Sequence, residues 1–153
     1  YRARMRVDFY HLTRSGPDGI VPVLADKLVA NGDRLLIVAE DQLILEGLDN
    51  QLWTAKPESF LPHAIAGGEG NDDAAEPVLL AVDPANPANG ARAILLADGQ
   101  WRDEALAYDR AFYLFDTATI DAARTAWKAL GQKDDLERHY WKQDDRGRWT
   151  EGP

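Results

Sequence analysis

The chain has 153 residues, of which 45% are hydrophobic and 28% charged, with a formal net charge of −9 and no cysteine. This composition is typical of one globular domain that buries a core without disulfide or metal support, so we expect a single domain over residues 1–153. It excludes thiol catalysis, thiolate zinc sites and a disulfide framework, and the acidic charge disfavours direct binding to DNA.

The first half of the chain alternates between strand and helix patterns. We expect a strand at 6–12, a helix from 21 to the Asn31-Gly32 stop, a strand at 34–39, and a second helix that begins after Asp41 and ends at Trp53. The run at 34–39 is almost continuously apolar, as in a parallel strand that helices cover on both faces. Met5, the only methionine, directly precedes the first strand, which indicates that residues 1–4 are an upstream extension.

The second half continues the alternation after an acidic, glycine-rich loop at 67–77. We expect strands at 78–82, 93–96 and 111–115, a weak helix at 103–110, a clear helix at 119–130 capped by Thr117 or Thr119, and a hairpin formed by 138–143 and 148–151. Gly131 is expected to end the clear helix. The pattern predicts an α/β, three-layer domain with a mainly parallel sheet flanked by helices and a C-terminal antiparallel hairpin.

No apolar run approaches the roughly twenty residues that a membrane helix needs. The chain does not open on a basic segment followed by an apolar stretch, which is the pattern of a secretory signal. We therefore expect a soluble, cytoplasmic protein that makes no membrane contact.

The sequence contains no recognisable catalytic pattern. The glycines at 67–70 lack the strand-to-helix setting of a phosphate loop, and neighbouring acidic residues would repel a phosphate. His11, His63 and His139 are far apart in sequence, and for His63 a structural hydrogen bond is the favoured interpretation. A Gly-x-Ser-x-Gly nucleophile elbow is missing. We expect no catalytic, cofactor-binding or metal-binding residues.

Two aromatic residues follow the second helix on a stiff segment. Trp53 ends the helix, and Phe60 lies between Pro57 and Pro62, which hold the backbone extended. A large aromatic after an amphipathic helix usually packs in the core, whereas a stiff segment presents its side chains to a partner at little entropic cost. Both interpretations stay open.

A second candidate surface lies on the helix at 119–130. Arg124, Trp127 and Lys128 stand at i, i+3 and i+4, so they share one face that offers two cations and an indole. Such a face suits an acidic peptide that ends in an aromatic residue, although a solvated helix with a half-buried tryptophan is an equal alternative. The residues expected to turn toward the sheet are Ile120, Ala123 and Leu130.

Five strings of the sequence resemble, in order and spacing, the chi subunit of bacterial DNA polymerase III holoenzyme. They are residues 6–12, 48–53, 58–63, 123–128 and 140–144, so the resemblance spans nearly the whole chain. It implies a fold similar to dinucleotide-binding domains without their cofactor, and a non-catalytic accessory subunit in DNA replication. The five strings together make the resemblance specific, although each alone is modest.

The resemblance also implies two partners. Family members link the clamp loader, through the psi subunit, to the acidic C-terminal tail of single-stranded DNA-binding protein. Arg124, Trp127 and Lys128 match positions of the tail-binding pocket. Trp53 and Phe60 match positions of the psi-facing surface, for which a repair helicase can compete. DNA would be contacted only indirectly.

This sequence departs from the family pattern at two positions. Ile120 stands where some relatives have a further basic residue, and Asp116 stands at a nearby position that is apolar in the pocket. Losing one exposed ion pair costs on the order of 1 kcal/mol or less, so we expect weakened but not abolished tail binding.

Two rival functions remain from other classes. An enzyme on the same scaffold would bind a nucleotide at the carboxyl edge of the sheet, because fold does not fix function. A single-stranded DNA binder would use the five tryptophans as stacking platforms, which the acidic charge opposes.

Overall fold

The structure is a computed structural model that describes residues 5–13, 16, 20–54, 62–68, 70, 72–85 and 87–152. Its elements, with η for a 3-10 turn, are β1 Met5–His11, α1 Val21–Ala30, β2 Leu35–Val38, α2 Gln42–Thr54, β3 His63–Ile65, η2 Asp73–Ala75, β4 Val78–Ala81, β5 Ala93–Leu96, η3 Asp103–Ala107, β6 Arg110–Phe115, η4 Thr117–Thr119, α3 Ile120–Leu130, β7 Leu136–Gln143 and β8 Trp149–Glu151. The alternation predicted from the sequence is confirmed.

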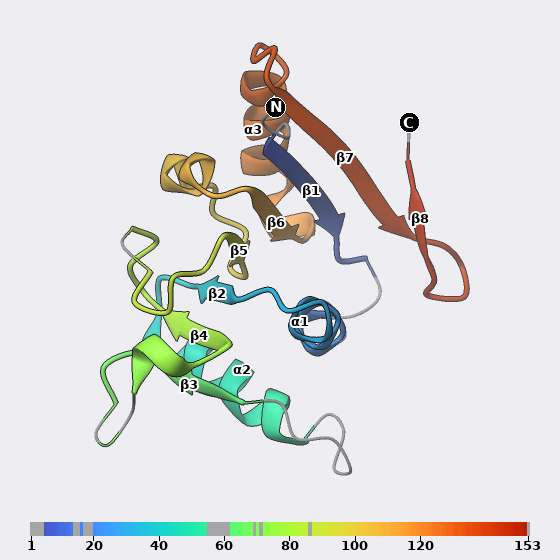
Figure 1. The fold of residues 1–153 in the computed structure, drawn as a ribbon. Helices are drawn as coiled ribbons and strands as arrows, with labels where there is room; N and C mark the ends of the chain where they lie inside the picture. Colours follow the sequence, from blue (N-terminus) through green and yellow to red (C-terminus); the bar gives the residue numbers. More distant parts are fainter. Residues whose placement is uncertain are drawn as a thin grey trace.

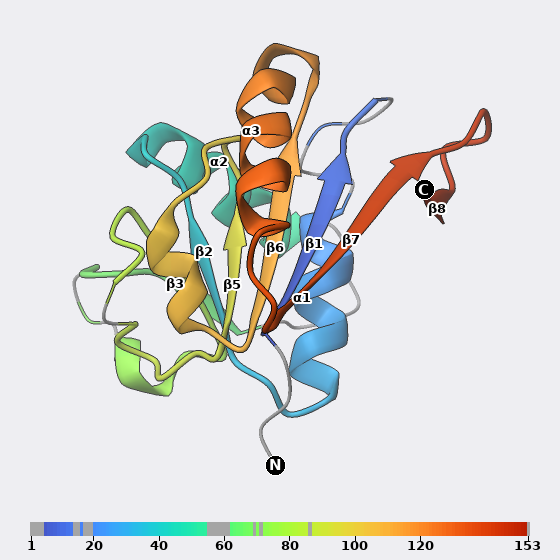
Figure 2. The same ribbon diagram turned by 90° about the horizontal axis from the view of Figure 1, so that it is seen from above.

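The described strands form one eight-stranded sheet in the order β3-β4-β2-β5-β6-β1-β7-β8 (Figure 1). Every neighbouring pair is parallel except β7 and β8, which form the expected antiparallel hairpin at one edge. Helices α1 and α2 cover one face and α3 covers the other, so the domain has three layers (Figure 2). The predicted fold class is confirmed.

The central strands are buried on both faces. All four residues of β2 and of β5 are buried, which explains why these segments read as continuous apolar runs rather than as alternating ones. Because successive side chains of a strand point to opposite faces, each strand contributes to two hydrophobic cores. The core under α1 and α2 contains Leu35, Ile37 and Leu95, and the core under α3 contains Leu36, Val38 and Ile94.

Thr119, one of the two residues expected to cap this helix, stands at the N-cap position of α3, but its side chain makes no capping hydrogen bond to α3. The capping hydrogen bonds lie one turn earlier, at η4, where Asp116 Oδ1 accepts a hydrogen bond of 3.1 Å from the backbone N–H of Thr119. Thr119 Oγ1 in turn accepts from the backbone N–H of Asp116 at 3.0 Å. This reciprocal capping box precedes the helix by one 3-10 turn, which sequence spacing alone does not separate from the helix.

Two short elements also differ from the expectation. β3 was not expected, because a strand of three residues is too short to show a periodicity. The segment predicted as a weak helix at 103–110 is the five-residue 3-10 turn η3 followed by the start of β6. β3 lies at the edge of the sheet far from the second candidate surface, whereas η3 contributes Ala105 to the core under α3.

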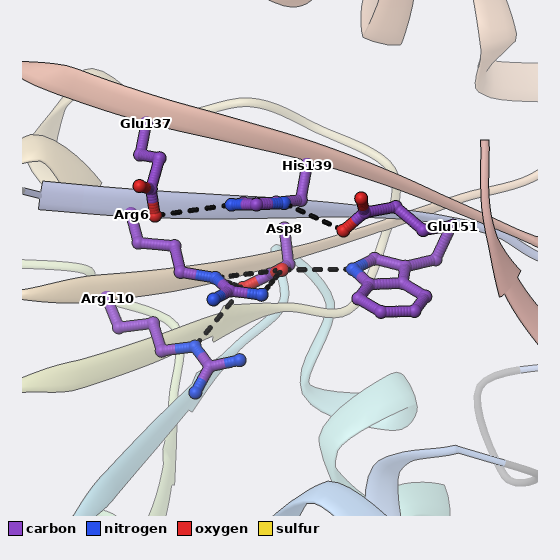
Figure 3. A network of polar contacts seen from close by, with 7 residues as sticks. Arg6, Asp8, Arg110, Glu137, His139 and Glu151 are labelled. Atoms are coloured by element: carbon purple, nitrogen blue, oxygen red, sulfur yellow. Dashed lines mark hydrogen bonds and ion pairs between the residues drawn. The ribbon is translucent and has the colours of Figure 1, made fainter. Parts of the chain in front are cut away.

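A buried carboxylate joins β7 to β1 on the face that α1 covers (Figure 3). Asp8 on β1 is 0% exposed and receives hydrogen bonds from Arg6, from Arg110 on β6 and from the indole Nε1 of Trp141 on β7, the last at 3.0 Å. Burial by itself would raise the pKa of Asp8, but the hydrogen bonds from Arg6 and Trp141 and the charge of Arg110 outweigh it and lower the pKa. The charged Asp8 thereby joins β1 to β6 and to β7, near one edge of the sheet.

Candidate functional site

The α3 face of the sheet carries an aromatic floor near its β7 edge. In the parallel register, Phe9 on β1 lies between Tyr113 on β6 and Tyr140 on β7, and His11 lies beside Phe115 on β6. Residues that are directly paired across parallel strands point to the same face, so these aromatic rings gather on one surface. Helix α3 connects β6 to β7 and lies in front of β6 in Figure 2.

Between this floor and α3 lies a cavity of about 320 Å³. Its lining residues come from β1, β6, α3 and β7, and they are Phe9, Phe115, Ile120, Ala123, Arg124, Trp127, Lys128 and Tyr140. The structure thus brings the three residues that the sequence placed on one helix face around a single concavity. It adds aromatic walls from three strands, which the sequence analysis did not anticipate.

The buried side of α3 explains how the helix approaches the sheet. Ala123, Ala126 and Leu130 are buried, and the two alanines let the helix backbone come close to the floor. Ile120, which was expected to turn toward the sheet, packs half-buried against the core under α3 and lines the cavity.

The Trp127 indole is a fixed wall of the cavity. Its ring meets Phe9 edge-on at 5.1 Å between centroids and Tyr140 edge-on at 6.3 Å. The guanidinium of Arg138, on β7, lies 4.0 Å from the ring centroid, and its Nη1 donates a hydrogen bond of 2.6 Å to the backbone oxygen of Trp127. A cation above an indole stabilises by about 0.5–2 kcal/mol, so Arg138 holds the ring in place.

The rim of the cavity is cationic. The Arg124 side chain is 70% exposed, and its ion pair with Asp121 is 3.7 Å long, a distance and exposure at which such pairs contribute little. Lys128 is exposed one turn further along the same helix. Asp116, which the resemblance placed near the pocket, caps η4 and is not among the lining residues.

A polar pair lies at the edge of the aromatic floor. His11 Nδ1 and the Tyr140 hydroxyl are 3.0 Å apart, and the imidazole stacks on Phe115 at 4.9 Å. Burial lowers the pKa of His11, an effect that the charge of Asp116 opposes and that of Arg124 reinforces. Burial raises the pKa of Tyr140 above its ordinary value of about 10. At neutral pH both groups are therefore uncharged.

The other predicted surface lies at the far end of the sheet. Trp53, at the end of α2, is 46% exposed, so it is not a core residue, and its ring lies 4.1 Å from the imidazole of His63 on β3. His63 is buried, and its Nε2 lies 3.1 Å from the backbone oxygen of Asp49, in agreement with the structural interpretation. Phe60 lies outside the described residues.

The carboxyl edge of the sheet, where similar folds bind phosphates, is acidic in this chain. Glu40, Asp98 and Asp116 follow shortly after β2, β5 and β6. In the glycine-rich loop, the backbone N–H of Gly67 already donates to Asp73 Oδ2 at 2.9 Å. These carboxylates would repel a nucleotide phosphate at this edge, which opposes the nucleotide-binding alternative.

Two further properties concern the described ranges alone. No group of three or more His, Asp or Glu residues in these ranges is placed to hold a metal ion. Within the same ranges, no helix combines the length and the apolar character required to cross a membrane.

Comparison with known proteins assigns the chain to a family. Residues 5–136 match the family described as DNA polymerase III chi subunit, HolC. The chain belongs to this chi-subunit family. A segment of 78 residues is also 33% identical to the DNA polymerase III subunit chi of Pseudomonas aeruginosa, covering 49% of this chain and 52% of that protein. The chain thus spans about half the length of the curated relative that it matches.

The family match ends before two residues that shape the cavity. Arg138 and Tyr140 lie on β7 beyond residue 136, although both contact Trp127 within the matched region. The C-terminal hairpin of this chi-family chain therefore contributes directly to the candidate site.

Proposed function

We propose that this chain is a non-catalytic accessory subunit of DNA polymerase III that acts in DNA replication as an adaptor between two protein partners. The cavity beside α3 binds the acidic C-terminal tail of single-stranded DNA-binding protein. The surface around Trp53, together with Phe60, binds psi or an equivalent clamp-loader component. The two surfaces lie on different elements, which suits an adaptor.

The observation that carries the tail-binding proposal is the composition of the cavity. A chain with a net charge of −9 places two cations, Arg124 and Lys128, beside an aromatic pocket of about 320 Å³. This volume is at the lower end for small-molecule sites and suits one aromatic side chain rather than a cofactor. An acidic peptide that ends in an aromatic residue matches both features, because its ring enters the pocket and its carboxylates meet the cations.

The two kinds of contact differ in size. An aromatic side chain that buries about 150 Å² contributes on the order of 3–4 kcal/mol before the costs of ordering the peptide are subtracted. Each exposed ion pair contributes about 1 kcal/mol or less. The ring contact with Trp127 therefore dominates, and replacing a basic residue by Ile120 weakens tail binding without abolishing it.

The test is a titration of a fluorescent tail peptide into the protein at moderate salt. We expect saturable binding that Trp127→Ala weakens by more than tenfold and Arg124→Glu by several-fold. The matched control is Arg92→Glu, which reverses the charge of a side chain that is 85% exposed and does not line the cavity. Absence of binding by the wild type, or equal losses in Arg124→Glu and Arg92→Glu, would reject the proposal.

The partner at Trp53 is tested separately. A half-exposed indole at the end of a helix is a common anchor of protein interfaces. We expect Trp53→Ala to weaken binding to psi by about tenfold and to leave the affinity for the tail peptide unchanged. A repair helicase is the alternative partner for the same surface, and competition between psi and the helicase, lost in Trp53→Ala, would show that they share it.

Direct binding to single-stranded DNA is the remaining alternative. The five tryptophans could stack on bases, but the net charge of −9 repels phosphates. We expect no binding of an oligonucleotide at physiological salt. Binding that falls steeply with salt and shows no preference for the peptide would favour this alternative.

A further inference from the structure

His11 and Tyr140 form a polar pair at the edge of the cavity. Tyr140 lines the cavity, and its hydroxyl lies 3.0 Å from His11 Nδ1. The second ring nitrogen, His11 Nε2, is buried and has no hydrogen-bond partner among the described residues. This orphaned atom restricts the way in which the pair can share its hydrogens.

The pair can arrange its hydrogens in two ways. With both groups uncharged, the imidazole carries one hydrogen and the phenol another. If His11 is protonated on Nε2, the phenol donates to Nδ1, and a buried N–H is left without an acceptor. If His11 is protonated on Nδ1, it donates to the Tyr140 oxygen, and Nε2 is left with a lone pair only. Orphaned buried N–H groups are rare, so the second arrangement is favoured.

The charge of Arg124 acts on both groups of the pair. It adds to the lowering of the His11 pKa and opposes the rise of the Tyr140 pKa that burial causes. Since His11 serves as the donor of the pair in the favoured arrangement, the phenolic hydrogen of Tyr140 is available to a ligand in the cavity.

We propose that Tyr140 donates its phenolic hydrogen to the terminal carboxylate of the bound peptide, with His11 as the positioning residue that keeps this hydrogen available. This inference rests on the proposed function and adds a determinant of specificity to it. Tyr140 and Arg124 bind the same carboxylate, because both border one cavity. A hydrogen bond from a hydroxyl to a carboxylate is short and charge-assisted, and an amide at the same place accepts it far less well.

The pair thereby selects peptides by their end group. A free terminal carboxylate accepts a hydrogen bond from Tyr140 and is attracted by the charge of Arg124. An amidated or extended end carries no charge there, so both interactions become weaker. The apolar floor formed by Phe9 and Phe115 binds the aromatic side chain in either case. The ratio of the affinities for the free-carboxylate peptide and the amidated peptide therefore measures the contribution of Tyr140.

The experiment compares two peptides with the same acidic sequence and the same terminal aromatic residue, one with a free carboxylate and one amidated. Both are titrated into the wild type, Tyr140→Phe and His11→Phe. We expect Tyr140→Phe to reduce the preference of the protein for the free carboxylate by about tenfold, the size of one hydrogen bond to a charged group. His11→Phe keeps the stacking on Phe115 and should reduce the preference by a few-fold.

A second readout reports on the hydrogens directly. We expect the ¹⁵N chemical shifts of His11 in the free wild type to show protonation on Nδ1. The matched control is Tyr108→Phe, which removes a hydroxyl that donates to the backbone oxygen of Pro84 outside the cavity. It should leave the preference unchanged.

The outcomes separate this inference from the proposed function. If the wild type binds both peptides equally, or if Tyr140→Phe weakens both equally, Tyr140 is only an apolar wall and the inference is overturned while tail binding stands. A His11 protonated on Nε2 overturns the positioning role. If the wild type binds neither peptide, the proposed function fails and the inference with it.

Discussion

At the scale of single residues, the site depends on side chains that are fixed before any ligand arrives. Arg138 holds the Trp127 ring from behind, and the backbone of Gly131 lies against Arg138, so that an added Cβ there would come within 2.8 Å of the guanidinium. On the opposite face of the sheet, Asp8 ties β7 to β1 through Trp141. A wall that is already ordered loses less entropy on binding than a mobile one.

Because Asp8 is charged in the folded protein, we expect the free energy of unfolding to depend on pH. Its pKa in the folded state is lower than the ordinary value of about 3.9, so folding favours the ionised form. Its contribution is fully present above the unfolded pKa and is lost as the pH falls through the folded pKa. We expect Asp8→Asn to lower the free energy of unfolding by about 2–3 kcal/mol at pH 7, because Arg6 and Arg110 lose their carboxylate.

Urea unfolding of the wild type and Asp8→Asn at several pH values checks this. The difference between them should shrink as the pH falls below about 4, because the unfolded chain then binds a proton at Asp8 while the folded wild type still holds it ionised. A difference that stays constant down to pH 2.5 would show that packing, and not charge, makes Asp8 important.

We expect a side chain added at Gly99 to clash with its surroundings, and the same change at a second glycine serves as the comparison. The φ of Gly99 is +76°, and an added Cβ would lie 2.5 Å from Thr119 Oγ1, within the capping box of η4. Gly90 has a φ of +68° and no atom within 4 Å of an added Cβ. We expect Gly90→Ala to cost about 1–2 kcal/mol for the left-handed backbone alone, and Gly99→Ala to cost clearly more. Thermal or urea unfolding measures both, and equal losses would contradict the predicted clash.

At the scale of elements, the C-terminal hairpin completes the molecule. β7 pairs with β1, supplies Tyr140 to the lining of the cavity, and places Arg138 against the Trp127 ring. β8 has three residues, but Trp149 on it meets Tyr10 edge-on at 5.2 Å and packs against the core under α1. The hairpin is therefore part of the domain core and not an appendage.

Docking of β8 can be tested at Trp149. We expect Trp149→Ala to lower the free energy of unfolding by about 1–3 kcal/mol, because a half-buried aromatic contact is lost. Thr150→Ala on the same strand is the control, since its exposed side chain should contribute within about 0.5 kcal/mol. Equal, small effects in both variants would show that β8 packs loosely.

The sequence predicted the helices and strands better than it predicted which side chains pack against one another. The apolar runs of β2, β4 and β5 and the spacing on α3 show in the sequence, because each pattern is local. The aromatic walls do not, because Phe9 and Tyr140 become neighbours only through a parallel register between strands 131 positions apart. A periodicity in the sequence likewise reveals neither a strand of three residues, such as β3, nor a cap that lies one turn before a helix.

At the scale of the whole molecule, the two proposed surfaces lie at opposite regions of one sheet. Trp53 lies beside β3, the first strand in the spatial order, and the cavity lies over β6, β1 and β7. Five steps separate β3 from β1 in that order, which corresponds to roughly 24 Å at about 4.8 Å per strand. The strands between them form a buried, rigid core.

This separation predicts that the two partners bind together without influencing each other. Sites more than about 10 Å apart without shared contacts usually act additively, so the affinity for the tail peptide should agree within about twofold with and without psi bound. A titration of the peptide into the protein alone and into its complex with psi measures this, with sedimentation velocity to confirm that all three components travel together. Trp53→Ala should reduce the effect of psi on sedimentation, in keeping with an about tenfold weaker affinity for psi, while the tail peptide still binds. Displacement of psi by the peptide would mean that the two partners share one surface, which an adaptor that connects them could not use.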